Sequence, residues 1–150
     1  MSKINLSVLI IIVSLLSSCG FHTPNKKTPL NASIVSEKSN AFANELKTRF
    51  NQSVNQNLTI QIDPEVQKQH TSSYTSGNVV NSYRLSLSVP VKVYSANQLL
   101  LLAQDLKASL HLSKITSSQA DRLQIEESYT QLRNTLIKKL IRRLSKLNAN

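Results

Sequence analysis

Cys19 is the only cysteine of the 150-residue chain, and its surroundings indicate which chemistry its thiol performs. A thiol can act as a nucleophile, bind a metal, form a disulfide or accept an acyl group. One cysteine cannot form a disulfide within its own chain, and a reactive thiol is a liability in an exported protein. Before Cys19 come Lys3, an uncharged apolar run over 4–16, and the small residues Ser17 and Ser18. This order is typical of a secretory signal with a small-residue cleavage site.

The end of this segment, Leu16-Ser17-Ser18-Cys19, resembles the bacterial lipobox. By that resemblance, residues 1–18 form a cleaved signal peptide, and Cys19 becomes the first mature residue and carries acyl chains. An apolar run of about 13 residues is also short for a membrane span, which needs about 20. An ordinary cleaved signal followed by an incidental cysteine is the alternative. Gly20 rather than an aspartate follows the cysteine, which by resemblance to the usual sorting pattern favours the outer membrane.

The rest of the chain is strongly basic. Of 18 Lys and Arg residues only Lys3 lies in the signal segment, so 17 remain beside eight acidic residues and leave a net charge of +9. A charge of this size indicates an anionic partner such as nucleic acid, lipid headgroups or an acidic protein. Export argues against nucleic acid, and the abundant polyanion of a bacterial envelope is lipopolysaccharide. A solvated basic surface without a partner is the equally open alternative.

No other residue pattern indicates catalysis or a cofactor. His22, His70 and His111 are far apart and lack a second ligand at metal spacing. Gly20 and Gly77 are the only glycines, so the chain has no glycine-rich phosphate loop, and it has no Gly-x-Ser-x-Gly sequence. We therefore expect no enzyme, no metal site and no cofactor.

The elements that must position any binding residue follow from hydrophobic periodicity. Residues 19–29 contain prolines and lysines without periodicity and predict a lipidated tether, followed by a single domain over 30–150. Alternating apolar residues predict short strands over 30–34 and 58–62, and apolar residues at intervals of four predict a helix over about 40–54.

The strongest pattern is an alternation from Tyr83 to Val93, in which apolar residues occupy every odd position. A period of two predicts a strand of roughly 40 Å with one buried face, so Arg84 and Lys92 point to a partner or to water. Pro90 cannot donate a ladder hydrogen bond, which predicts an edge strand or a bulge there. The preceding segment 67–78 is polar, so a strand there is expected to give way to a loop.

Residues 98–112 fit two structures. Leucines at intervals of three and four predict a helix, whereas the same segment has leucines at strand parity. Ala96-Asn97 would form a hairpin turn onto such a strand. The residues alone leave both structures open.

A long amphipathic helix is predicted over 118–147, with a length of about 45 Å. Ser118 and Asp121 match the start of a capping box. Its second half carries six basic residues and no acid: Arg133, Lys138, Lys139, Arg142, Arg143 and Lys146. Basic residues suit this end of the helix dipole. They either contact anionic lipid or form a solvated face, and the solvated face is the favoured interpretation.

The order of these elements resembles the LptE family of lipopolysaccharide-assembly lipoproteins. Cys19-Gly20-Phe21-His22 resembles the family's mature start, residues 83–89 its central strand, and residues 140–144 the end of its last helix. The resemblance implies an α+β fold, with two helices packed on one face of a mixed four-stranded sheet after a lipoprotein signal peptide. It also favours a strand over 98–112.

The resemblance implies a function as well. Family members assemble with the LptD β-barrel and assist lipopolysaccharide transport and insertion at the outer membrane, where the lipid anchor holds them on the periplasmic face. Some members contact lipopolysaccharide through basic residues before the central strand and near the start of the last helix. The loop 75–78 is uncharged here, so the candidate contacts are Arg84, Lys92 and Arg122. An adaptor lipoprotein of another envelope secretion or lipid-trafficking system is the alternative.

Overall fold

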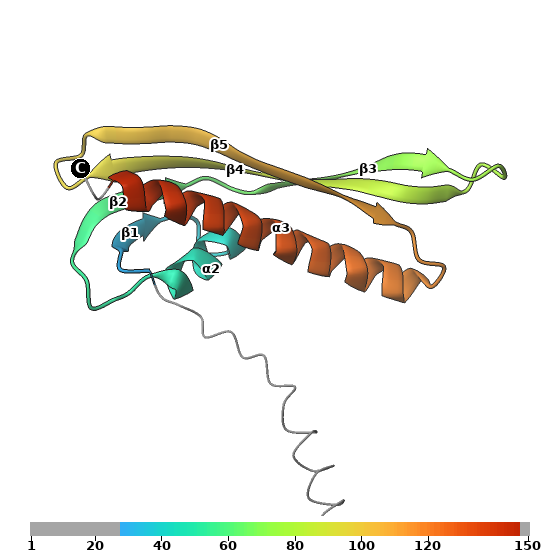
Figure 1. The fold of residues 1–150 in the computed structure, drawn as a ribbon, viewed down its shortest axis with the longest axis horizontal. Helices are drawn as coiled ribbons and strands as arrows, with labels where there is room; N and C mark the ends of the chain where they lie inside the picture. The colour runs from blue at the N-terminus through green and yellow to red at the C-terminus, as the bar shows by residue number, and fades with distance from the viewer. Residues whose placement is uncertain (1–27, 148–150) are drawn as a thin grey trace, which may run out of the picture.

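The computed structural model describes residues 28–147, so the predictions for the signal peptide, for Cys19 and for most of the tether concern residues outside this range. The elements in chain order are β1 (Asn31–Val35), α2 (Ala41–Arg49), β2 (Gln56–Ile62), β3 (Val66–Tyr74), β4 (Val80–Ser95), β5 (Leu100–Ser113) and α3 (Ser118–Leu147), as Figure 1 shows.

Strand β4 is the centre of the sheet. One of its edges pairs with β5 over nearly its whole length, and both strands run antiparallel. The other edge pairs with β3 along the first half of β4 and with β2 along the second half. Strand β1 adds to β2 in parallel. The sheet is therefore mixed, four strands wide at the β1 end and a three-stranded ribbon at the other end (Figure 1).

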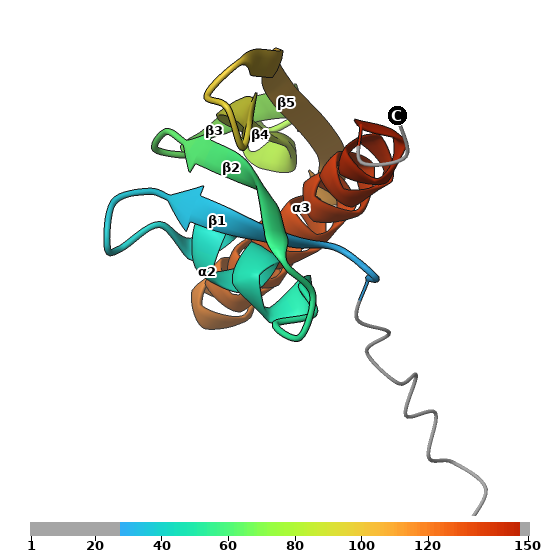
Figure 2. The same ribbon diagram turned by 90° about the vertical axis from the view of Figure 1, so that its left-hand side faces the viewer.

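Both helices pack against the same face of this curled sheet (Figure 2). The odd-numbered side chains of β4 from Tyr83 to Val93 are all buried, which confirms the predicted apolar face. They form one core with Phe42 and Leu46 of α2 and with four leucines of α3, which are Leu132, Leu136, Leu140 and Leu144. Burial of these apolar surfaces is the main force that holds the two layers together. The predicted α+β fold with two helices on one face is confirmed.

Helix α3 has the predicted bounds, but its start differs from the predicted capping box. Ser117, not Ser118, caps the helix: its carbonyl accepts from Asp121 N at 2.9 Å. The buried Asp121 carboxylate accepts instead from the backbone N–H of Ile115 at 2.8 Å and from the Tyr83 hydroxyl at 3.2 Å. It thereby joins the start of α3 to β4. Burial and this contact with Asp121 raise the pKa of Tyr83 above its ordinary value.

Helix α2 is shorter than the predicted 40–54. The Asn40 side chain caps it by accepting from Ala43 N at 2.9 Å. It ends at Arg49 because Phe50 takes an extended conformation and is buried in the core. The packing of Phe50 therefore decides where the helix stops.

The segment 98–112, which the residues alone left open, is strand β5. The turn before it is the predicted hairpin, in which Ser95 N donates to Leu99 O at 2.9 Å and Gln98 N donates to Ser95 O at 3.0 Å. Leu106 is fully buried, whereas Leu102 and Leu110 are partly buried against the core. Pairing with the full length of β4 therefore selects the strand, as the family resemblance implied.

The loop predicted for 67–78 is wrong over most of that segment, because Val66–Tyr74 forms strand β3. Its side chains are almost all exposed, so no apolar alternation marks it in the sequence. Backbone hydrogen bonds to β4 hold it in place rather than a buried face. Only the residues after Tyr74 form the turn into β4, where Asn78 N donates to Thr75 O at 3.0 Å.

The expectation that Pro90 marks an edge strand or a bulge is also wrong, since β4 is the central strand and stays in register with β5 at this residue. Strands β2 and β3 are separated by Asp63-Pro64-Glu65, and Pro90 lies opposite this break. Asp63 N donates to Pro90 O at 3.1 Å. Because the N and O atoms of a residue in an antiparallel strand point to the same side, the missing N–H of Pro90 faces the interruption.

The break between β2 and β3 is held to α3 by an ion pair between Glu65 and Arg133. Arg133 Nε donates to Glu65 Oε2 at 2.9 Å, and Arg133 Nη2 donates to Glu65 Oε1 at 2.8 Å. The two side chains are only 14% and 16% exposed. Burial raises the pKa of Glu65, but hydrogen bonds from Arg133 and Gln67 and the Arg133 charge outweigh it and hold that pKa below its ordinary value of 4.5.

Replacing Glu65 with Gln is expected to lower the free energy of unfolding at pH 7 by about 2 kcal/mol, because Arg133 loses its charged partner while partly buried. A depressed carboxyl pKa stabilises the fold above the unfolded pKa, and that contribution disappears as the pH falls through the folded value. Denaturant titrations should therefore show the gap between wild type and Glu65→Gln closing below about pH 4. Glu126→Gln is the matched control, because its 3.8 Å pair with Arg122 is exposed. That control should change stability by less than about 0.5 kcal/mol.

Candidate anion-binding groove

The outward face of the β3–β4–β5 ribbon brings basic and hydroxyl side chains together. Residues directly opposite each other in antiparallel strands share a face. Arg84 of β4 therefore lies between His70 of β3 and His111 of β5. The next row is Lys68, Ser86 and Ser109, and the row after it is Val66, Ser88 and Lys107.

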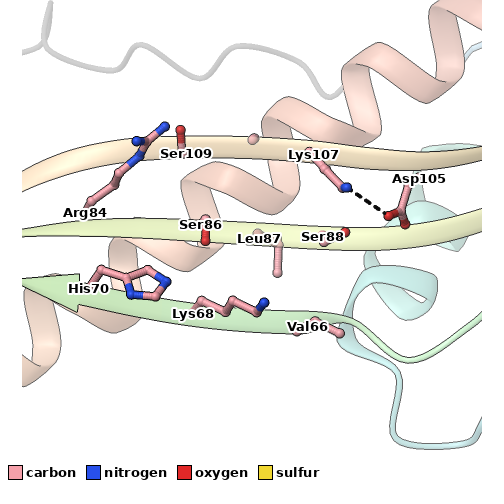
Figure 3. Close-up of a pocket in the computed structure, with 11 residues that line it drawn as sticks. Val66, Lys68, His70, Arg84, Ser86, Leu87, Ser88, Asp105, Lys107 and Ser109 are labelled. Atoms are coloured by element: carbon pink, nitrogen blue, oxygen red, sulfur yellow. Dashed lines mark ion pairs between the residues drawn. The ribbon is translucent and has the colours of Figure 1, made fainter.

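Apart from His111, the residues of these rows line a groove of about 860 Å³ (Figure 3). We call it the basic groove and define it by Lys68, His70, Arg84, Lys107 and the serines 86, 88 and 109. Figure 3 shows the basic side chains coming from all three strands around the short serines on the floor. The floor is open because serine side chains are small.

The basic groove has excess positive charge. Its one acid, Asp105, pairs with Lys107 at 3.2 Å. Lys68 and Arg84 are exposed, and neither forms an ion pair within residues 28–147. An arginine fork and a lysine ammonium are the usual donors to phosphate oxygens, and serine hydroxyls bind phosphate or sugar oxygens. This arrangement suits a phosphorylated, hydroxyl-rich ligand.

Of the three candidate contacts from the sequence, only Arg84 lies in the basic groove. Lys92 projects from the same face of β4, but its cross-strand neighbours are the uncharged Gln61 and Ala103. Arg122 belongs to the helical layer and forms an exposed ion pair with Glu126 at 3.8 Å. The structure does not bring these two side chains to Arg84.

Sequence reasoning missed Lys68, His70 and Lys107 as groove residues. Lys68 and His70 lie in the segment expected to be a loop, and Lys107 lies in the segment with two possible structures. Their register against Arg84 depends on pairing between strands, which no local pattern reveals. If both segments had been assigned as strands paired with β4, the residues that share a face with Arg84 would have included these three.

The described part of the chain offers few other sites. Residues 28–147 contain no cluster of three His, Cys, Asp or Glu side chains that could hold a metal ion. Within the same residues, no helix combines the length and apolar character needed to cross a membrane. Lys138, Lys139, Arg142 and Lys146 of α3 are exposed.

Comparison with known proteins decides the family. The family model described as "LptE: Lipopolysaccharide-assembly" matches residues 29–145, from just before β1 almost to the end of α3. The chain belongs to the LptE family. The resemblance based on the central strand and the last helix is thereby confirmed, and the chain is a member of a lipopolysaccharide-assembly lipoprotein family. No curated protein matches the sequence significantly.

Solved structures of other lipoproteins share this fold. Rare lipoprotein B from Shewanella oneidensis superposes with a TM-score of 0.67 at 11% identity, covering 79% of this chain and 96% of its own. Lipoprotein B from Nitrosomonas europaea superposes with a TM-score of 0.64 at 15% identity, covering 83% of this chain and 88% of its own. At these identities the likeness concerns the fold, so the basic groove must be judged from this chain's own residues.

Proposed function

We propose that this LptE-family chain is a non-enzymatic outer-membrane lipoprotein, anchored through Cys19 on the periplasmic face. It assembles with an LptD-like β-barrel and assists the transport and insertion of lipopolysaccharide. The family match over residues 29–145 is the observation that carries this proposal. The lipobox-like sequence before Cys19 supports the anchor, and the net charge of +9 that remains without residues 1–18 supports an anionic partner.

Within this function, the basic groove contacts the phosphorylated headgroup of lipopolysaccharide. Arg84 and Lys68 supply positive donors that form no ion pair within residues 28–147, and the serines of the floor supply hydroxyl groups. A phosphorylated sugar presents phosphate oxygens that accept from the positive donors, and sugar oxygens that accept from the serine hydroxyl groups. Lys92 and Arg122 lie outside the groove, so any contact they make belongs to a second surface.

Depletion of the protein tests the proposal. The expected result is loss of lipopolysaccharide from the cell surface, measured by surface labelling, together with recovery of a β-barrel protein when the chain is purified from solubilised outer membranes. A preparation without any barrel protein would contradict the partnership. Unchanged surface lipopolysaccharide, with a defect in another export or lipid-trafficking process, would instead favour the adaptor function.

A further inference from the structure

Strand β5 leaves one long edge of the sheet without a neighbouring strand. Within residues 28–147, β5 pairs with β4 alone (Figure 1). Pro90 O accepts from Asp63 N on the other side of β4, so Pro90 exchanges no hydrogen bonds with Asp105, its neighbour in β5. The N–H and C=O groups of Asp105 therefore point to the free edge, as do those of every second residue along β5. Such a row of unpaired donors and acceptors is a template for another strand.

The free edges of β1 and β3 are protected in ways that the β5 edge is not. Strand β1 has only five residues, and register shifts interrupt the ladder of β3 after Thr71. Short edge strands and bulges are devices that prevent pairing between sheets. Strand β5 has 14 residues without proline, and its register with β4 is regular from Leu102 to Ser113. The β5 edge is therefore the one best suited to accept a further strand.

The two charges of β5 match a second copy of the same strand in one register. When Leu106 lies opposite Leu106 of a second, antiparallel copy, Asp105 lies opposite Lys107 of that copy, and Lys107 lies opposite its Asp105. A shift of two residues one way places Asp105 opposite Asp105, and a shift the other way places Lys107 opposite Lys107. A shift of one residue would set outward side chains against inward ones. Because opposite charges attract across strands and like charges repel, the register centred on Leu106 is favoured.

The inward face of β5 agrees with this register. Leu102 and Leu110 are only partly buried against the core. With Leu106 at the centre, Leu102 of each copy lies opposite Leu110 of the other. The pairing therefore covers apolar surface that the single chain leaves exposed, which stabilises the contact.

We propose that two copies of the chain pair through their β5 edges and form one continuous sheet. The two-fold axis passes between the two Leu106 residues, so both copies use the same surface. The Asp105–Lys107 pair, 3.2 Å within each chain, meets its counterpart at the axis as four alternating charges (Figure 3). Because paired residues share a face, both basic grooves open on one side of the sheet and both α3 helices lie on the other.

A second copy suits this edge better than the wall of the proposed barrel partner. A closed barrel has no free strand edge, so its wall cannot extend the sheet at β5. The dimer is therefore a state of the chain before it assembles with a barrel. In that state the pairing shields an edge that would otherwise promote aggregation.

Exchange of the two charges tests both the dimer and its register. The experiment uses the Cys19→Ala chain at micromolar concentration, so that neither an acyl chain nor a thiol contributes to association. Sedimentation velocity should give twice the mass of one chain. Asp105→Lys sets lysine against lysine and Lys107→Asp sets aspartate against aspartate, so each substitution should weaken dimerisation by about tenfold or more.

An equimolar mixture of these two variants should form a heterodimer, because both pairs across the axis again join opposite charges. Native mass spectrometry identifies the heterodimer, since the two variants differ in mass. The double variant Asp105→Lys with Lys107→Asp should dimerise like the parent chain, which shows that the single variants fail through charge rather than misfolding. Lys68→Asp is the matched control, because it makes the same charge change as Lys107→Asp on β3 and should leave the dimer intact.

Two results would overturn the inference. A parent chain that stays monomeric would exclude the dimer. Dimers of Asp105→Lys or Lys107→Asp as stable as those of the parent chain would exclude this register. Neither result affects the proposed function, which rests on the family match and not on the β5 edge.

Discussion

Replacing Cys19 with alanine is expected to move the protein from the membrane fraction to the soluble fraction of the cell envelope. Each acyl chain contributes on the order of 10 kcal/mol to membrane binding, at about 0.8 kcal/mol per buried CH₂ group, and stable anchoring needs more than one chain. Sedimentation of the envelope, in cells that lack the proposed barrel partner, measures the distribution.

The fold should survive this substitution, because the core lies within residues 28–147 and does not involve Cys19. Ser18→Ala is the matched control, since it keeps a small residue before the cysteine and should leave the protein in the membrane fraction. If processed Cys19→Ala protein stayed tightly membrane-bound without the partner, lipid attachment at Cys19 would be contradicted.

Reversing the charge of Arg84 and Lys68 together, as Arg84→Glu with Lys68→Glu, is expected to weaken lipopolysaccharide binding by about 100-fold. A hydrogen bond to a charged group contributes about 1.5–3 kcal/mol, so the loss of two such contacts amounts to about 3 kcal/mol or more. Both side chains are exposed on the outer face of the ribbon, so the core is not disturbed. Equilibrium binding of purified lipopolysaccharide to the unacylated Cys19→Ala chain measures the effect.

The control for the groove is the pair Lys92→Glu with Arg122→Glu, which makes the same change in net charge outside the basic groove. It should weaken binding much less, because long-range attraction between exposed charges is screened by salt. An equal loss from both pairs would show that binding follows net charge rather than the groove. Lipopolysaccharide stripped of its phosphates should bind the wild-type chain weakly.

Much of the fold was predictable where one element carries its own pattern. Strand β4 has a buried face next to the helices, so its odd residues from Tyr83 to Val93 had to be apolar. Helix α3 is long enough for its leucines to repeat many times, which makes its bounds clear. The family resemblance rested on these two elements, on the start Cys19-Gly20-Phe21-His22 and on the order of the elements.

Other parts depended on neighbours that are distant in the sequence. Strand β3 has no buried face, so its polar residues gave no strand signal, and only its ladder to β4 orders it. Strand β5 carries leucines that suit either a helix or a strand, and pairing with β4 selects the strand. Pro90 is tolerated in a central strand only because the opposite edge is interrupted at Asp63-Pro64-Glu65.

By itself, the sequence determined the buried face of β4, the length of α3 and the excess of positive charge, and it predicted an export signal ending at the lone Cys19, because each of these is encoded in consecutive or regularly spaced residues. Only the tertiary structure decided that Lys68, His70 and Lys107 join Arg84 in one groove, and that the segment 98–112 is a strand. Both depend on strand register and direction. Those are set by hydrogen bonds between distant segments, which local periodicity does not record.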